Sequence, residues 1–140
     1  MSFNYMNASN ITLSTTGLCD ADARLNIGRV TQAVDVSGIE TQISFAGGLA
    51  ASGSNYQVIG PEDGGTAGTG TTDIGTALSS ASTAWTDLTP RAVTASTSAD
   101  DLDADDYVNL QLDETGSVTA PTALSVFMNY VYGIPGGVVN

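Results

Sequence analysis

Hydrophobic and polar residues alternate between Tyr107 and Asp113, where Val108, Leu110 and Leu112 take every second position. A period of two is typical of a strand with one face on a core. The later run from Ala123 to Tyr132 is apolar on both faces. One face carries Leu124, Val126, Met128, Tyr130 and Tyr132, and the other carries Phe127 and Val131. Such a strand must be covered on both sides, by a second sheet and a loop or by another subunit.

Short apolar runs separated by turn residues predict further strands upstream. They lie within Leu25–Val36, Thr41–Ala46, Tyr56–Ile59 and Ala92–Ser96. Between Asp73 and Leu88 the pattern favours two strands over a short helix, because the density of Ser and Thr is poor for a helix. Gly60-Pro61 is expected to end the strand before it, and Pro61 to Thr72 has the composition of a flexible exposed loop. We therefore predict an all-β fold, an antiparallel β-sandwich of jelly-roll or Greek-key type.

The chain has 140 residues, which suits one domain with its own core. Residues 1–23 are polar and irregular, with one strand-like piece at Ile11–Leu13, and predict an extended N-terminal arm ahead of a sandwich domain spanning 24–140. The lone Cys19 has no partner for a disulfide and is expected to be a small buried apolar residue. No signal peptide or membrane-length apolar run is present, so synthesis in the cytoplasm is expected.

The net charge and the charged residue types of the chain argue against several classes of function. The chain contains no Lys and no His, and its three Arg face fifteen Asp and Glu, for a net charge of −12. Phosphate backbones and anionic membranes would repel such a protein, which argues against nucleic-acid and membrane binding. Ser-His-Asp, Cys-His and Schiff-base chemistry all need residues that this sequence lacks. We expect a protein that is not an enzyme and needs no cofactor.

Two motifs suggest binding sites. Gly64 to Gly70 resembles a phosphate loop but lacks its Lys and its dinucleotide spacing. Asp101, Asp103 and Asp105 alternate as the first ligands of a calcium loop do, yet Asp106 stands where that loop needs Gly and Leu112 where it needs Glu. A solvated acidic turn is the preferred interpretation, with calcium as the alternative. The aromatic residues fit core, subunit interface or ligand stacking; they include Trp85, Tyr107, Tyr130 and Tyr132.

The C-terminal half resembles a known class of protein. Leu102-Asp103-Ala104-Asp105-Asp106-Tyr107-Val108-Asn109-Leu110, a loop containing Gly, and Leu124 to Gly133 look like the closing hairpin of capsid decoration (cement) proteins of tailed bacteriophages. The likeness covers Leu102 to Gly133 well and the chain from Leu25 onward more loosely. It implies an all-β homotrimer on the outer surface of the virion, bound to the major capsid protein and bridging capsomers.

Given this resemblance, we interpret apolar positions as candidate contact residues. Phe127, Tyr130, Val131 and Tyr132 are the expected subunit interface, and Phe3, Tyr5, Ile11 and Leu13 of the arm are the expected capsid-binding residues. The alternative function is the receptor-binding head of a tail fibre or spike, which also trimerises and exposes loops rich in Gly and Thr. A fibre head usually follows fibrous repeats, and the short arm favours decoration. An adhesin, a minor pilin subunit or an enzyme ranks third.

Overall fold

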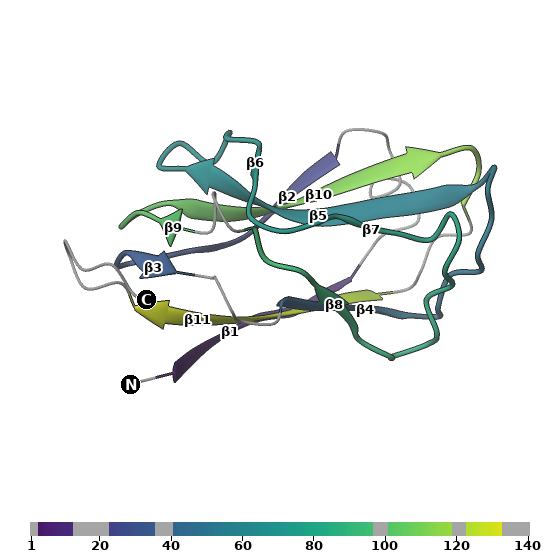
Figure 1. Cartoon of the computed structure of the whole chain (residues 1–140), viewed down its shortest axis with the longest axis horizontal. Helices are drawn as coiled ribbons and strands as arrows, with labels where there is room; N and C mark the ends of the chain where they lie inside the picture. The colour runs from purple at the N-terminus through teal and green to yellow at the C-terminus, as the bar shows by residue number, and fades with distance from the viewer. Residues whose placement is uncertain (1–2, 13–22, 36–40, 97–100, 119–122, 133–140) are drawn as a thin grey trace.

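The computed structural model describes residues 3–12, 23–35, 41–96, 101–118 and 123–132. Two antiparallel sheets lie one above the other, as Figure 1 shows. In chain order the strands are β1 (Phe3–Thr12), β2 (Ala23–Arg29), β3 (Val34–Asp35), β4 (Thr41–Ala46), β5 (Tyr56–Gly65), β6 (Thr72–Asp73), β7 (Leu78–Ser79), β8 (Arg91–Val93), β9 (Asp101–Leu102), β10 (Tyr107–Thr115) and β11 (Ala123–Tyr132). The described residues contain no helix. The predicted all-β sandwich is confirmed, and the helical alternative for 73–88 is wrong.

The first sheet is built around β11. One edge of β11 pairs with β1, and the other pairs with β4 and then β3, while β8 continues from β4 and β9 from β3. The second sheet is built around β10, which lies between β2 and β5, and β6 and β7 pair with successive parts of β5. Apart from the pairing of β5 with β6 and β7, the neighbours in both sheets come from distant parts of the chain.

The period-two patterns place the core between the two sheets. Val108, Leu110 and Leu112 of β10 are at most 1% exposed. On β11 the residues Leu124, Val126 and Met128 are equally buried, whereas Phe127 between them is 41% exposed. Successive strand residues point to opposite faces, so one set of β11 side chains faces β10 and the other faces outward. The alternation predicted for both strands is confirmed over these positions.

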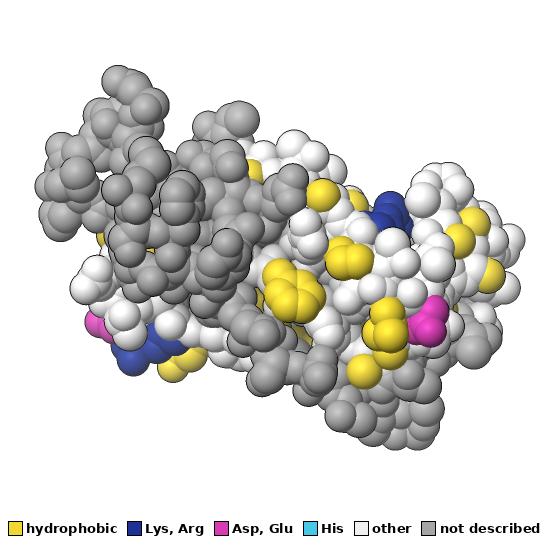
Figure 2. Space-filling view, turned by 90° about the horizontal axis from the view of Figure 1, so that it is seen from below, with side chains coloured by type: hydrophobic (Ala, Val, Ile, Leu, Met, Phe, Trp, Pro, Cys, Tyr) yellow, Lys and Arg dark blue, Asp and Glu magenta, His cyan; other side chains and the backbone are white. Residues whose placement is uncertain are grey.

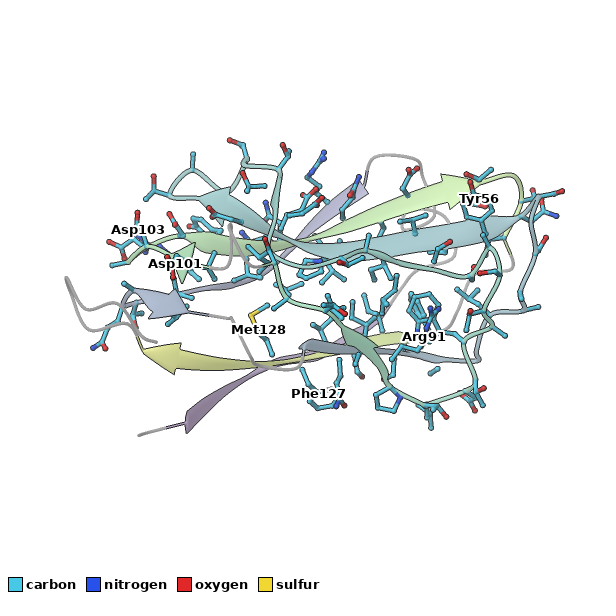
Figure 3. All side chains as sticks on the ribbon, in the orientation of Figure 1. Tyr56, Arg91, Asp101, Asp103, Phe127 and Met128 are labelled. Atoms are coloured by element: carbon cyan, nitrogen blue, oxygen red, sulfur yellow. The ribbon has the colours of Figure 1, made fainter. Side chains whose placement is uncertain are left out.

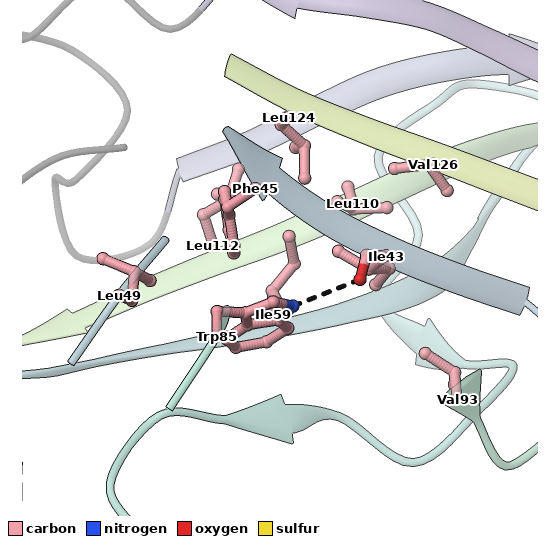
Figure 4. Close-up of a cluster of buried hydrophobic side chains, with 10 residues drawn as sticks. All are labelled: Ile43, Phe45, Leu49, Ile59, Trp85, Val93, Leu110, Leu112, Leu124 and Val126. Atoms are coloured by element: carbon pink, nitrogen blue, oxygen red, sulfur yellow. Dashed lines mark hydrogen bonds between the residues drawn. The ribbon is translucent and has the colours of Figure 1, made fainter. Parts of the chain in front are cut away.

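Trp85 anchors one end of the core (Figure 4). Its ring meets that of Phe45 edge to face at 5.0 Å between centroids, and its Nε1 donates a hydrogen bond of 3.1 Å to the carbonyl of Ile43. The Arg91 guanidinium lies 4.2 Å from the centroid of the Trp85 ring. With only 2% of its surface exposed, Trp85 is a core residue. The surrounding cluster consists of Ile43, Phe45, Leu49, Ile59, Val93, Leu110, Leu112, Leu124 and Val126.

Strand β5 continues past Pro61, where the sequence suggested that it would end. The carbonyl of Pro61 accepts a hydrogen bond from Ile74 N, away from β10. The N and O of one residue point to the same edge of a strand, so the missing N–H of Pro61 also lies away from β10. Position 61 falls between the residues of β5 that pair with β7 and those that pair with β6. No ladder bond is lost, and proline is tolerated inside the strand.

The glycine-rich segment after β5 is folded against the second sheet. Asn109, buried on the face of β10 opposite Leu110, donates from Nδ2 to the carbonyls of Gly68 at 3.0 Å and Gly70 at 3.5 Å. The backbone of Gly70 also donates to Gly64 O at 2.7 Å. A Cβ on Gly70 would lie 2.6 Å from the carbonyl oxygen of Asp63. These contacts hold the segment so closely that a side chain at position 70 has no space.

The segment expected as an extended arm is partly a strand. Residues Phe3–Thr12 form β1, which pairs antiparallel with β11 along most of its length, with a register shift between Ala8 and Ile11. The predicted strand-like piece therefore begins earlier than Ile11. Leu13 and Cys19 lie outside the described residues, and the division at residue 23 stays a prediction.

The close approach at Gly70 gives a test of the fold. We expect Gly70→Ala to reduce the free energy of unfolding by about 1–3 kcal/mol, because the added methyl group forces Gly70 away from Asp63 and weakens the bonds to Asn109. Gly53→Ala is the matched control, since a Cβ there would meet nothing within 4 Å. Urea denaturation of both variants measures the difference. Equal midpoints for Gly70→Ala and Gly53→Ala would show that the segment is not held in this way.

Candidate functional site

The outward side of the first sheet carries an exposed aromatic residue, Phe127. Phe127 of β11 stands directly opposite Gln42 of β4, and Gln42 stands opposite Ala92 of β8. Figure 3 shows Phe127 pointing away from the second sheet while Met128 points toward it. Ser125 lies on the same side as Phe127, two positions along β11. We call the surface formed by Gln42, Ala92, Ser125 and Phe127 the outer face.

A second exposed hydrophobic residue lies at the edge of the same sheet. Leu88 is 67% exposed, and its backbone N donates to the carbonyl of Phe45 in β4 at 2.9 Å. Its φ of 54° is in the left-handed region, which is uncommon for a residue with a branched side chain. Leu88 and Phe127 are the large hydrophobic residues exposed in the described part of the chain. Figure 2 views this side, where hydrophobic side chains stand among uncharged ones, with a few charged side chains nearby.

Charge is unevenly distributed between the two sheets. No charged side chain occurs in residues 1–19, 41–46 or 115–140. These ranges contain the whole of β1, β4 and β11, which are neighbours in the first sheet. The long strands of the second sheet all carry charge, at Arg24 and Arg29 in β2, at Glu62 and Asp63 in β5, and at Asp113 and Glu114 in β10. A chain of net charge −12 thus has a neutral three-stranded region.

The two groups of predicted contact residues meet at this neutral region. The backbones of Phe3, Tyr5 and Ile11 pair with those of Val131, Asn129 and Leu124. The predicted capsid-binding residues Phe3, Tyr5 and Ile11 belong to β1, and all of the predicted interface residues belong to β11, so the two groups lie on adjacent strands. Phe127 is placed at an exposed position. The structure describes the backbone but not the side chains of six other predicted contact residues, which are Phe3, Tyr5, Ile11, Tyr130, Val131 and Tyr132. Leu13 lies outside the described residues.

The acidic turn lies at one end of the sandwich (Figure 3). Asp101, Asp103 and Asp105 are exposed, and the Asp105 carboxylate pairs with the Arg29 guanidinium at 3.1 Å. Arg29 Nε also donates to the backbone carbonyl of Asp105. In the described ranges, no three Cys, Asp or Glu side chains are grouped as a metal ion requires. The structure therefore does not bring the calcium candidates together, and the turn is tied to β2 by Arg29.

Asp106 differs from the other aspartates of this turn because it is buried, with 7% of its surface exposed. Its Oδ2 accepts a hydrogen bond of 2.9 Å from Asp103 N. Burial raises the pKa of Asp106, and the negative charges of Asp63, Asp103 and Asp105 raise it further, while the bond from Asp103 N opposes the shift. The carboxyl of Asp106 closes the turn, but its ionised form is disfavoured there.

An open pocket of about 610 Å³ lies at the other end of the sandwich. Three loops line it, and their residues are Gly47, Gly48, Leu49, Ala50, Ser52, Asn55, Ala84, Trp85, Asp87, Ser117 and Val118. Asp87 Oδ1 accepts a bond from Gly47 N at 2.7 Å, and Asn55 Oδ1 accepts one from Ser117 N at 2.9 Å. Both side chains thus hold the loops together, and Trp85 is too deeply buried to stack on a ligand.

Sequence reasoning missed one polar contact of the second sheet. Glu62 is 2% exposed and accepts hydrogen bonds from Arg24 Nε at 2.8 Å and Nη2 at 3.5 Å. The pair spans β10 and links β2 to β5. A two-point ion pair fixes geometry better than a single contact, so it favours this order of strands. The ion pair between Arg24 and Glu62 could not be predicted from the residues near either one, because 38 positions separate them in the sequence.

Comparison with protein-family models, with curated proteins and with solved structures found no match. In the described part of the chain, no helix has the length and apolar character needed to cross a membrane. The functional interpretation therefore depends on the residues and the geometry given above.

The buried carboxyl of Asp106 predicts a pH dependence. The folded protein holds this proton more tightly than the unfolded chain does, so stability is lost as the pH rises from below about 3.9, the usual Asp value, through the raised pKa. Asp106→Asn cannot ionise, while its side-chain oxygen can still accept the bond from Asp103 N. We expect this variant to gain in melting temperature relative to the natural protein between pH 3 and pH 7.

Thermal melts at both pH values measure this gain, and Asp101→Asn, which removes an exposed charge from the same turn, controls for net charge. A melting-temperature difference that is the same at pH 3 and pH 7 for Asp106→Asn would contradict the assignment.

Proposed function

We propose that this protein is a structural virion protein, a decoration or cement protein that binds as a homotrimer to the outer surface of a bacteriophage capsid. The observation that carries the proposal is the neutral outer face with its exposed Phe127, in a chain of net charge −12. The resemblance of Leu102 to Gly133 to such proteins supplies the particular assembly. Within the proposal, the sandwich is of the jelly-roll or Greek-key type.

Electrostatics favours the outer face as the contact between copies. Identical subunits with fifteen acidic residues each repel one another wherever their charged surfaces meet. The region of β1, β4 and β11 avoids this cost because it carries no charge. Phe127 adds an aromatic anchor, the kind of residue that dominates interface energies when a partner buries it. Copies of this chain are therefore expected to meet through the first sheet.

The protein would act by reinforcing the capsid shell mechanically. A trimer bound at a point where capsomers meet adds contact area to each of them, and its three subunits act together, so the effective concentration of the second and third contacts is high. Acidic surfaces directed away from the shell would keep the particle soluble and repel nucleic acid. The major capsid protein is the expected partner, and binding to it requires no catalytic residue or cofactor.

The second candidate is the receptor-binding head of a tail fibre or spike. The pocket between the loops at 47–55, 84–87 and 117–118 favours it, because loops at the end of a β-sandwich commonly form binding surfaces. The residues that could hold a ligand in this pocket, Asp87 and Asn55, already bond to the neighbouring loops. We therefore place decoration first.

The outer face provides a mutational test. Phe127→Asp places a charge in the proposed interface, where it would be buried without a partner. We expect the trimer to dissociate into folded monomers, because Phe127 makes no part of the core and its replacement leaves Leu124, Val126 and Met128 in place. Light scattering measures the mass, and circular dichroism reports the sheet.

Thr66→Asp is the matched control, since Thr66 is exposed on the loop over the second sheet and should leave the trimer intact. An unchanged trimer in Phe127→Asp would show that subunits meet elsewhere.

Copy number separates the two candidate functions. A decoration protein binds throughout the head and should be present in hundreds of copies per virion, whereas a fibre head is confined to the tail and should be present in a few tens or fewer. Quantitative mass spectrometry of purified particles, normalised to the major capsid protein, gives this number. A low copy number would favour the fibre head over decoration.

A further inference from the structure

In the part of the chain that the structure describes, strand β1 pairs with β11 alone, although it also contacts β2. All of its backbone pairing in the structure is with β11, from Phe3 opposite Val131 to Thr12 opposite Ala123. It forms the edge of the first sheet, since β4 and β3 pair with the other edge of β11, and Figure 1 shows β1 next to β11. Because β1 is an edge strand, it can leave this position or enter an equivalent one without breaking the pairing between any other two strands.

Ten residues, 13–22, separate β1 from β2 in the sequence. Thr12 pairs with Ala123 in the first sheet, and Ala23 pairs with Leu112 in the second. Leu112 and Leu124 belong to one core cluster, so these strand ends face each other across the sandwich. Packed sheets are about 10 Å apart, whereas the ten residues 13–22 can span about 35 Å when extended. The same connection can therefore reach a neighbouring subunit.

The pairing between β1 and β11 is also free of charge. Neither strand carries an ionisable group, apart from the tyrosines, and no charged side chain precedes Asp20. Two copies of this acidic chain could bring these strands together without electrostatic cost. An identical strand from another copy would form the same hydrogen bonds with β11, which is why exchange of an element between subunits costs little.

We infer that β1 is exchanged between copies in the assembled protein, so that the β1 strand of each subunit occupies the β11 edge of the next. The inference rests on the proposed homotrimer and identifies the segment that links its subunits. Exchange in one direction around a ring closes after three subunits, and every β11 edge is then filled. The occupant of the β11 edge is a second copy of Phe3–Thr12, in the register seen here.

Disulfide trapping tests this exchange. In a Cys19→Ser background, one variant carries Tyr5→Cys with Asn129→Cys and another carries Asn4→Cys with Tyr130→Cys, both at paired positions. Adjacent antiparallel pairs alternate between closer and wider spacing, so one of the two variants has the closer geometry that suits a disulfide. Exchange predicts covalent trimers on a non-reducing denaturing gel, which return to monomers on reduction.

A control keeps the two cysteines on different chains. Single variants Tyr5→Cys and Asn129→Cys, refolded together, should give a cross-linked dimer that contains one chain of each kind. Neither variant refolded alone should give this product.

Cross-linked monomers from material that light scattering shows to be trimeric would overturn the exchange and leave the homotrimer standing. A monomer in solution would instead overturn the homotrimer itself. Absence of any cross-link in both double variants would also refute the inference, because the register of β1 on β11 would not exist in solution.

Discussion

The alternation along β11 is the constraint on which this fold depends. Leu124, Val126 and Met128 are withdrawn from water against the second sheet, and burial of apolar surface is the main favourable contribution to folding. A shift of one residue in register would exchange these side chains with Ser125 and Phe127. The pairing of β11 with β1 and β4 is thereby fixed, and Phe127 is left outside. The same strand holds the first sheet together and supplies the exposed part of its surface.

Charge is distributed in a way that complements this packing. Acidic residues lie in β5, β6 and β10 of the second sheet, in the turn at 101–106 and, in the first sheet, at Asp35 of β3, whereas β1, β4 and β11 carry no charge. Within the second sheet, the buried Glu62 is compensated by Arg24, and Arg29 pairs with Asp105 at the acidic turn. The charge that would keep the molecule soluble is thus separated from the surface proposed to join copies, so assembly and solubility do not oppose each other.

Polar contacts determine the shape of the segments that lack hydrophobic patterning. Asn109 fixes the glycine-rich segment through two carbonyls, and Asp106 closes the acidic turn that precedes β10. Both residues flank or belong to β10, the central strand of the second sheet. Their burial means that each must find a hydrogen-bond partner, and the partners are backbone groups of adjacent loops. The core strand therefore also orders the loops on either side of it.

The sequence by itself determined the strands of strong alternation and the class of fold, because burial on one face of a strand requires a period of two. It also indicated that Phe127 faces away from Leu124 and Val126. Only the tertiary structure decided that Pro61 could lie inside β5, that Gly64 to Gly70 would be held by Asn109, and that Arg24 would pair with Glu62. These features depend on which distant segments become neighbours, and that choice results from long-range pairing, which no local pattern encodes.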